Sequence, residues 1–247
     1  MKQNEAVIVT LEKLGGIATL GQLNQEVMKI EDCKWKTKTP FASIRRIVQL
    51  DKNIFKIKPG LYGLVKNRKE LESRGIFEES MANKNSKEVV EFNHSYYQGL
   101  ILTVGNLKGF GTFVPNQDKN RMFINQKLDE VRTLKALPEY TYPAIVQRSS
   151  TIDVIWFNER KMPHSFFEIE HSTDIQNSLL KFNDLQDFSS RMVIVADISR
   201  KSEYENKIKY SSFKNLSDKK RVEFLDYEAL NKQYENIIQQ QQFGFIL

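Results

Sequence analysis

Two apolar runs in the middle of the chain carry carboxylates where a buried strand ordinarily has none. The first run spans residues 152–157 and contains Asp153, and the second spans residues 166–171 and contains Glu168 and Glu170. β-Branched and aromatic residues dominate both runs, which predicts two strands. Because a buried carboxylate without a partner destabilises a fold, these acids indicate a compensating cation nearby.

The spacing of the three acids predicts a common site. Residues two apart on a strand face the same side, so Glu168 and Glu170 converge, and a hairpin brings Asp153 to the same point. Three carboxylates repel one another unless a cation lies between them, and oxygen ligands suit a hard ion such as Mg²⁺. Metal-assisted cleavage of a phosphodiester is the expected chemistry. In the alternative interpretation, Glu168 and Glu170 face solvent on an edge strand while Phe167 and Ile169 face the core.

Helical and strand patterns alternate through the C-terminal part of the chain. Helices are expected at residues 87–104, 128–137 and 227–238 and after a cap at Ser172-Thr173, and further strands at 110–114, 192–196 and 222–225. Together with the two acid-bearing strands, this order predicts an α/β fold with a central mixed sheet flanked by helices.

The N-terminal part has the pattern of three helices followed by a hairpin. Helices are expected up to Gly15-Gly16, over residues 20–30, and over 41–49 after Pro40, with a short strand at 17–19. Two runs at residues 54–57 and 61–64, joined by Lys58-Pro59-Gly60, predict a β-hairpin. This order is the winged helix-turn-helix arrangement.

A polar and charged segment separates the two parts and predicts a domain boundary. We expect a winged-helix domain at residues 1–68, a linker at 69–87 and an α/β domain at 88–247.

Positive charge is concentrated in the N-terminal part. The chain has a net charge of +6, whereas the twelve basic and three acidic residues from Lys29 to Lys69 give that segment +9, which leaves −3 for the rest. This asymmetry predicts that the basic part binds a polyanion while the other part holds acidic chemistry. The alternative is a solvated lysine-rich surface.

Cysteine and histidine are scarce, which excludes several classes of site. The only cysteine, Cys33, cannot form an intramolecular disulfide, and three histidines make a histidine-rich metal site improbable. No apolar run approaches the roughly 18 residues that span a bilayer, and the N-terminus lacks a signal-peptide pattern. A cytoplasmic protein without membrane contact is expected.

The acid-bearing strands resemble a known catalytic signature. Asp153, fourteen further residues and then Glu168-Ile169-Glu170 resemble the PD-(D/E)xK motif of restriction endonuclease-like nucleases in its ExE form, although Ile152 replaces the proline. The resemblance, which covers about residues 88–226, implies that Asp153 and Glu168 bind Mg²⁺. Glu170 stands where lysine is usual and would share the metal or accept a proton. Lys181, on the next helix, is the alternative source of positive charge.

Other polar residues of this domain have simpler interpretations. Glu91 is a candidate further acid near the metal, but a solvated helix glutamate is the more economical interpretation. His94 and His164 are interpreted as surface residues, and His171 as structural.

The N-terminal segment resembles the HARE-HTH type of winged helix. The resemblance rests on residues 35–46 and on Lys58-Pro59-Gly60-Leu61-Tyr62-Gly63-Leu64. In such modules the third helix usually enters the major groove and the wing contacts the DNA backbone. The candidate DNA contacts are Lys36, Lys38, Ser43, Arg45, Arg46, Lys56 and Lys58.

The two resemblances together imply a Mg²⁺-dependent endonuclease that cuts double-stranded DNA and belongs to the type II restriction enzymes, with modification-dependent cleavage as the alternative to cleavage of unmodified sites. A homodimer is expected on DNA because both strands must be cut, and cleavage of unmodified sites would imply a companion DNA methyltransferase. The competing hypotheses are a non-catalytic winged-helix regulator with a degenerate nuclease fold and a repair or junction-resolving nuclease.

Overall fold

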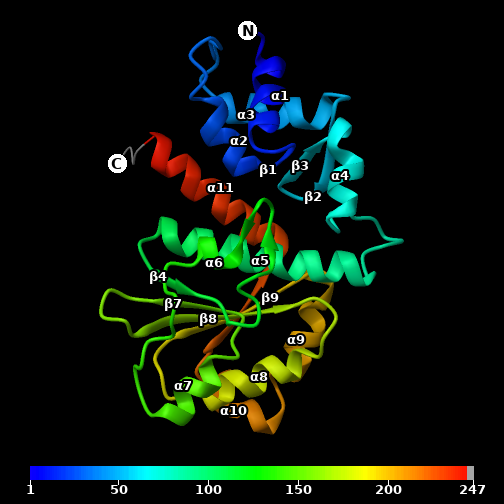
Figure 1. The fold of residues 1–247 in the computed structure, drawn as a ribbon. Coiled ribbons are helices and arrows are strands. Elements are labelled where there is room, and N and C mark those ends of the chain that lie inside the picture. Colours follow the sequence, from blue (N-terminus) through cyan, green and yellow to red (C-terminus); the bar gives the residue numbers. More distant parts are fainter. Residues whose placement is uncertain (244–247) are drawn as a thin grey trace. The chain divides into compact units, whose positions relative to one another are not determined.

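The computed structural model describes residues 1–243 and divides into two compact units (Figure 1). The N-terminal unit consists of Met1–Val89 together with the described residues from Asn231 to Phe243. The central unit consists of Val90–Leu230. The domain limits expected from the sequence at residues 68 and 88 stay a prediction, because compact packing alone does not define functional domains.

The N-terminal unit contains the helices and the hairpin that the sequence predicted. Its elements are α1 (Gln3–Lys13), β1 (Ile17–Thr19), α2 (Leu20–Val27), α3 (Pro40–Leu50), β2 (Ile54–Lys58), β3 (Leu61–Leu64), η1 (Val65–Asn67) and α4 (Arg68–Ser73). The three strands form an antiparallel sheet in the order β1-β3-β2. Apolar side chains of α1, α2 and α3, including Leu11, Leu23 and Ile44, pack into one core with the sheet.

The C-terminal helix α11 (Tyr227–Phe243) contributes its second part to the same unit. The Tyr234 hydroxyl lies 3.3 Å from Thr19 Oγ1, and the Tyr234 ring occupies the space beside Gly21. Asn231 donates a hydrogen bond of 3.1 Å to the carbonyl of Pro59, in the turn between β2 and β3. These contacts join the end of the described chain to its first strands.

The expected linker at residues 69–87 is partly regular. Most of α4 lies in it, and Leu71 and Ile76 are buried. An ion pair of 3.3 Å between Lys58 and Glu79 further joins this segment to the hairpin.

The central unit is built on a five-stranded mixed sheet, as the sequence predicted. Its elements are α5 (Lys87–Leu107), which enters the unit at Val90, β4 (Gly111–Phe113), β5 (Met122–Phe123), β6 (Gln126–Lys127), α6 (Leu128–Val131), α7 (Pro143–Ser149), β7 (Val154–Phe157), β8 (Pro163–Glu170), α8 (Ile175–Asp184), β9 (Arg191–Ala196), η2 (Ile198–Arg200), α9 (Lys201–Lys207), η3 (Ser211–Phe213), α10 (Lys214–Asp218) and β10 (Val222–Asp226). The strand order is β10-β9-β8-β7-β4. Pairing is parallel from β8 to β10 and antiparallel from β8 to β4.

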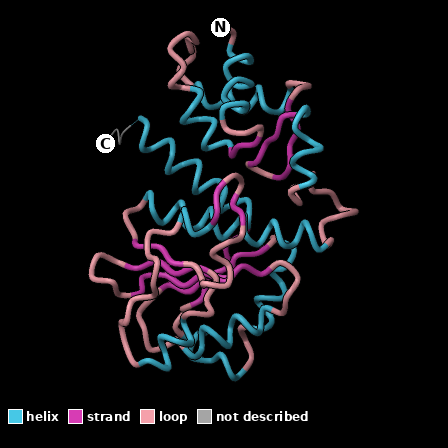
Figure 2. Tube along the Cα trace, in the orientation of Figure 1, coloured by secondary structure: helices cyan, strands magenta, loops and turns pink. Residues whose placement is uncertain are grey.

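Helices cover both faces of this sheet (Figures 1 and 2). On one face, Trp156 of β7 donates a hydrogen bond of 3.2 Å to the carbonyl of Ile101 in α5. On the other face, Phe166 of β8 packs in one cluster with Leu179 of α8 and Leu216 of α10. Alternation along β8 therefore assigns Glu168 and Glu170 to the face of α8, which bears on the chemistry of the site.

Two local expectations were wrong. The helix expected at residues 128–137 ends at Val131, because the next residues run beside β4. Leu134 N donates a hydrogen bond of 2.9 Å to the carbonyl of Thr112, and the Arg132 side chain donates one of 2.9 Å to the carbonyl of Val114. The cap of α8 is Asp174 rather than Ser172-Thr173, since its carboxylate accepts a hydrogen bond from Gln176 N at 2.8 Å.

Candidate active site

The acid-bearing strands β7 and β8 pair as the predicted antiparallel hairpin. Val154 pairs with Phe167, which places Asp153, one residue before β7, opposite Glu168. β8 also pairs with β9, so it is an interior strand, and both Glu168 and Glu170 are buried. The interpretation in which these two glutamates face solvent on an edge strand is therefore wrong.

Asp153, Glu168 and Lys181 form one bonded group. Asp153 N donates a hydrogen bond of 3.3 Å to Glu168 Oε1. Asp153 Oδ2 in turn accepts a hydrogen bond of 2.8 Å from Ile169 N. Lys181 of α8 extends its Nζ to both oxygens of Glu168, at 3.0 and 2.8 Å, and to the carbonyl of Thr151 at 2.9 Å. The ammonium group of Lys181 is thus the cation that the buried acids required.

Glu170 has a different set of partners from Glu168. One of its oxygens accepts a hydrogen bond from Thr173 Oγ1 and the other from Ser178 Oγ, and Arg200 Nη1 lies 3.8 Å from Oε2. Ser178 Oγ also lies 2.9 Å from Glu168 Oε2. One hydroxyl hydrogen cannot serve two carboxylates, so this geometry favours a proton held on one of the two glutamates.

Burial changes the proton affinity of all three acids. Burial, together with the Asp153 carboxylate, raises the pKa of Glu168 to about 8, against the opposing effect of Lys181. Burial also raises the pKa of Asp153, although the imidazole of His94 lowers it in part. The pKa of Glu170 is raised by burial as well, and the Ser178 and Thr173 hydroxyls oppose that rise. A site in which such acids are kept charged therefore needs added positive charge.

A further group of potential metal ligands lies beside Asp153. His94 of α5, Asp118 of the loop after β4, and Asp153 each offer one ligand atom within 4.8 Å of the others, so they could hold a metal ion. His94 had been interpreted as a surface residue, and this was wrong: its Nε2 lies 3.6 Å from Asp153 Oδ1 and its side chain is 22% exposed. Sequence reasoning missed Asp118 because it lies in a polar loop outside any motif.

His94 and Asp153, but not Asp118, line a pocket of about 350 Å³ in the central unit. All four predicted catalytic residues, Asp153, Glu168, Glu170 and Lys181, contribute to its wall. Glu91 lines the same pocket from α5. The tertiary structure thus brings the acids, the lysine and the histidine to one open cavity.

The predicted DNA-binding residues differ in exposure. Lys36, Lys38, Arg45, Arg46 and Lys56 are exposed, and Ser43 is half-buried. Arg45 is paired with Glu235 of α11. Lys58 is buried and its Nζ lies 3.3 Å from Glu79, so in this conformation it does not present its charge to a phosphate. A bulge between Lys56 and Lys58 explains the difference, because it breaks the alternation that would place both on one face.

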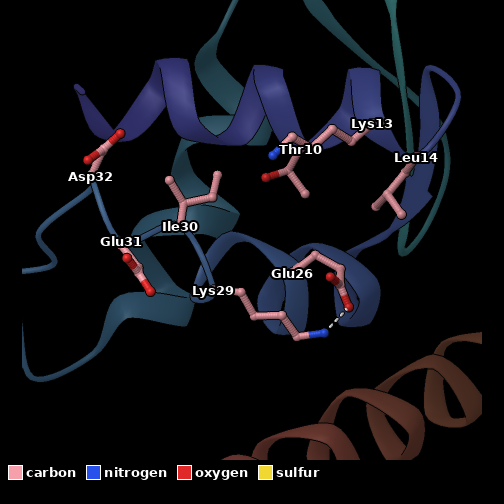
Figure 3. Close-up of a pocket in the computed structure, with 8 residues that line it drawn as sticks. All are labelled: Thr10, Lys13, Leu14, Glu26, Lys29, Ile30, Glu31 and Asp32. Carbon is pink, nitrogen blue, oxygen red and sulfur yellow. Dashed lines mark hydrogen bonds and ion pairs between the residues drawn. The ribbon is translucent and has the colours of Figure 1, made fainter.

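A second pocket, of about 400 Å³, lies in the N-terminal unit beside α1 and α2 (Figure 3). Glu26 and Lys29 form an ion pair of 2.6 Å across one end. Figure 3 shows the carboxylates of Glu26, Glu31 and Asp32 well separated from one another. Since polar groups do not converge there, the pocket of the central unit is the stronger candidate site.

The family of the chain is established by sequence comparison. Residues 76–246 match the family described as the type II restriction enzyme NmeDI C-terminal domain, and since the match covers most of the chain, the chain belongs to this family of type II restriction enzymes. It is similar to the type II restriction enzyme NmeDI of Neisseria meningitidis serogroup C, with 24% identity over 155 residues. The similar region is 59% of this chain and 43% of that enzyme, so the chain matches less than half the length of its relative. No solved structure matches the chain.

No helix among residues 1–243 is both long and apolar enough to cross a membrane.

Proposed function

We propose that this chain is a Mg²⁺-dependent endonuclease of the type II restriction class that cleaves double-stranded DNA. The observation that carries the proposal is the pair of half-buried Asp153 and buried Glu168, with Lys181 bonded to both oxygens of Glu168. Two acids and one lysine are the chemical groups of a PD-(D/E)xK centre, here with the lysine on α8 rather than on β8. Membership of the NmeDI family supports the same activity.

Asp153 and Glu168 fit an oxygen-ligated Mg²⁺. Their carboxylates are adjacent, and the ammonium group of Lys181 already occupies a cation position on Glu168. When bound, Mg²⁺ would neutralise charge on the scissile phosphate and lower the pKa of the attacking water. Lys181, freed from Glu168, would hold that water and an oxygen of the phosphate by hydrogen bonds.

Glu170 has another role in this proposal. Both of its oxygens accept hydroxyl hydrogen bonds, from Ser178 and Thr173, so they are less available to an ion than those of Asp153. We therefore propose that Lys181 takes the place of the usual lysine and that Glu170 fixes Ser178 beside Glu168.

We propose further that the N-terminal unit is a winged helix that binds DNA. Three helices with the β2–β3 hairpin, and the exposed cations on and near α3, support this role. The proposed contact residues are Lys36, Lys38, Ser43, Arg45, Arg46 and Lys56. Lys58 is left out because it is buried against Glu79. Phosphate contacts of this kind give affinity that weakens with salt.

Cleavage of both DNA strands requires two such centres, so we propose a homodimer on DNA. If the enzyme cuts unmodified sites, a companion DNA methyltransferase is expected to protect the host DNA. A modification-dependent enzyme would need none.

Digestion of paired methylated and unmethylated genomic DNA with Mg²⁺, followed by sequencing of the cut ends, tests the activity. Discrete bands from one of the two DNAs are expected. Asp153→Ala and Glu168→Ala should abolish cleavage and leave DNA binding within a few-fold of wild type. Lys181→Met should slow cleavage by about 100-fold or more, because it removes the group that positions the water. Lys201→Met, an exposed lysine of the same unit, is the matched control.

If wild-type protein leaves both DNAs uncut with Mg²⁺ and with Mn²⁺, the enzyme hypothesis is wrong. Salt-sensitive binding without cleavage would then favour the non-catalytic regulator. Cleavage without discrete bands on long duplex DNA would favour a repair or junction-resolving nuclease.

A further inference from the structure

His94 and Asp118 approach Asp153 from outside the predicted motif. His94 Nε2 is 3.6 Å from Asp153 Oδ1, which is longer than a hydrogen bond. Two ligands that lie about 2.1 Å from one ion at a tetrahedral angle are about 3.4 Å apart. The separation of His94 and Asp153 therefore fits two ligands of a common cation.

Asp118 is buried and held from two sides. Its Oδ2 accepts a hydrogen bond of 3.0 Å from Gln98 Nε2, and its Oδ1 lies 2.8 Å from Arg121 Nε. Each carboxylate oxygen has a second lone pair that these contacts leave free for a ligand bond. Outer contacts of this kind fix the orientation of metal-binding carboxylates.

Gln98 supplies an independent indication that the group accommodates a ligand. Its side chain is fully buried on α5, and its Nε2 also donates a hydrogen bond of 3.2 Å to the carbonyl of Asp153. Within the described residues, Gln98 Oε1 has no hydrogen-bond partner. A buried acceptor left in this state costs about 1–3 kcal/mol. In this conformation Nε2 rather than Oε1 faces Asp118, so a cation at the adjacent carboxylates would give the amide oxygen a partner only once the amide group turns over; amide oxygens do bind metal ions.

We propose that His94, Asp118 and Asp153 bind a second divalent cation that accepts both nitrogen and oxygen ligands, such as Mn²⁺ or Zn²⁺, in preference to Mg²⁺. The imidazole decides the class of ion, since Mg²⁺ favours ligands that are all oxygen. The proposal rests on the proposed function only in that Asp153 is shared with the Mg²⁺ centre.

The two oxygens of Asp153 face different neighbours, which supports the sharing of Asp153 between two metal sites. Oδ1 lies on the side of His94, whereas Oδ2 accepts the hydrogen bond from Ile169 N. Asp153 thereby stands between the His94–Asp118 group and the Glu168–Lys181 pair. Shared carboxylates of this kind hold both ions of two-metal phosphodiester-cleaving centres.

Mn²⁺ binding to the whole, metal-free chain tests the site without any measurement of cleavage. Isothermal titration gives the affinity, and pulsed EPR of bound Mn²⁺ detects coupling to a directly bound imidazole nitrogen. Wild type should show the nitrogen coupling. His94→Asn should lose it and should bind Mn²⁺ at this site roughly 10- to 100-fold more weakly, with Mg²⁺ affinity changed much less.

His164→Asn is the matched control, because His164 packs on Phe110 away from the pocket and its loss should leave the coupling intact. Asp118→Asn is a second variant in case His94→Asn fails to fold, as judged by circular dichroism, and it should weaken Mn²⁺ binding while keeping the contact from Gln98. Nitrogen coupling or unchanged Mn²⁺ affinity in folded His94→Asn overturns the proposal.

The two proposals fail separately. If wild type cuts DNA with Mg²⁺ but shows no nitrogen coupling with Mn²⁺, the second site is wrong and the nuclease function stands. If the coupling is present but no DNA is cut, the metal site stands and the proposed function fails.

Discussion

Glu168 is the residue on which the electrostatics of the candidate site depend most. Its buried carboxyl accepts hydrogen bonds from Asp153 N and Lys181 Nζ and lies 2.9 Å from Ser178 Oγ. Without Lys181 its charge would destabilise the strand, because a lone buried charge is poorly solvated. The same contact supports the proposed metal site, since the Lys181 ammonium group already lies at this carboxylate.

Replacing Glu168 with glutamine tests its raised pKa. The carboxyl has a pKa of 4.5 in the unfolded chain but about 8 when folded. Between these two pH values the Glu168 carboxyl is protonated in the folded chain and ionised in the unfolded chain. The stabilisation that protonated Glu168 gives to the folded chain is therefore fully present below about pH 4.5 and is lost as the pH rises to about 8. In metal-free buffer, the melting temperature of Glu168→Gln should therefore fall less than that of wild type between about pH 5 and about pH 8.

Exposed Glu159→Gln is the control and should follow the wild-type curve. A chain of this size changes its melting temperature by about 2–4 °C per kcal/mol, so the difference is measurable by calorimetry. Parallel pH curves for Glu168→Gln and wild type would contradict the raised pKa.

At the scale of elements, the candidate site depends on how α8 covers β8. Ser178 and Lys181 are three residues apart on α8 and therefore share a face, which lies over Glu168 and Glu170. A strand buried on both faces accepts two acids here because the covering helix supplies a hydroxyl and an ammonium group. The period of two along β8 placed both acids on one face, but only the packing of α8 decided that a helix covers this face.

The hairpin of β2 and β3 offers a matched pair of lysines. Lys56→Met should weaken duplex DNA binding and reduce the slope of log affinity against log salt by about 1, because an exposed phosphate contact is lost. Lys58→Met should leave both quantities unchanged, since the bulge turns Lys58 inward to Glu79. Fluorescence anisotropy over a salt series measures the two variants. Equal losses for both lysines would contradict this assignment.

Lys58→Met also has an expected effect on stability. Burial lowers the pKa of Lys58 from 10.5 to about 8 in the folded chain. The unfolded chain therefore binds more protons between these values, so wild-type stability should rise with pH across that window, and the rise should be smaller in the variant. Burial disfavours the charged form of Lys58, and the Glu79 side chain is 30% exposed, so Lys58→Met leaves no fully buried charge without a partner and little loss of stability is expected near pH 7.

At the scale of the whole molecule, the chain leaves the N-terminal unit at Val89 and re-enters it at Asn231. The N-terminal unit is therefore built from two separate segments of sequence. The family match from residue 76 to 246 includes parts of both units. The segment that matches the family thus does not coincide with one compact unit of the structure.

Tyr234→Ala tests whether α11 stabilises the N-terminal unit. The substitution removes a buried ring beside Gly21 and the hydroxyl that lies 3.3 Å from Thr19 Oγ1. We expect a loss of about 3–5 kcal/mol in the free energy of unfolding, by analogy with other large buried aromatics. Hydrogen exchange should show the loss in α1, α2 and β1 but not in β8 or β9. Gln239→Ala, exposed on the same helix, is the control, and protection lost uniformly from both units would contradict the expected localisation.

The sequence by itself determined the local elements and the first pair of candidate site residues. Apolar period and turn residues predicted the N-terminal helices, both hairpins and the mixed sheet, because these signals lie within a few neighbouring residues. The facing of Asp153 and Glu168 followed from the same reasoning, since a short hairpin leaves few alternatives for its register.

Only the tertiary structure decided which other groups meet those acids. His94, Asp118 and Gln98 come from a helix and a loop that precede β7, and nothing in their own neighbourhood marks them as partners of Asp153. The separate partners of Glu170, and the inward turn of Lys58, likewise depend on packing and on one bulge. The physical reason is that helices and strands pack so as to bury their apolar faces. This packing decides which polar groups far apart in the sequence meet, and a local sequence pattern does not encode it.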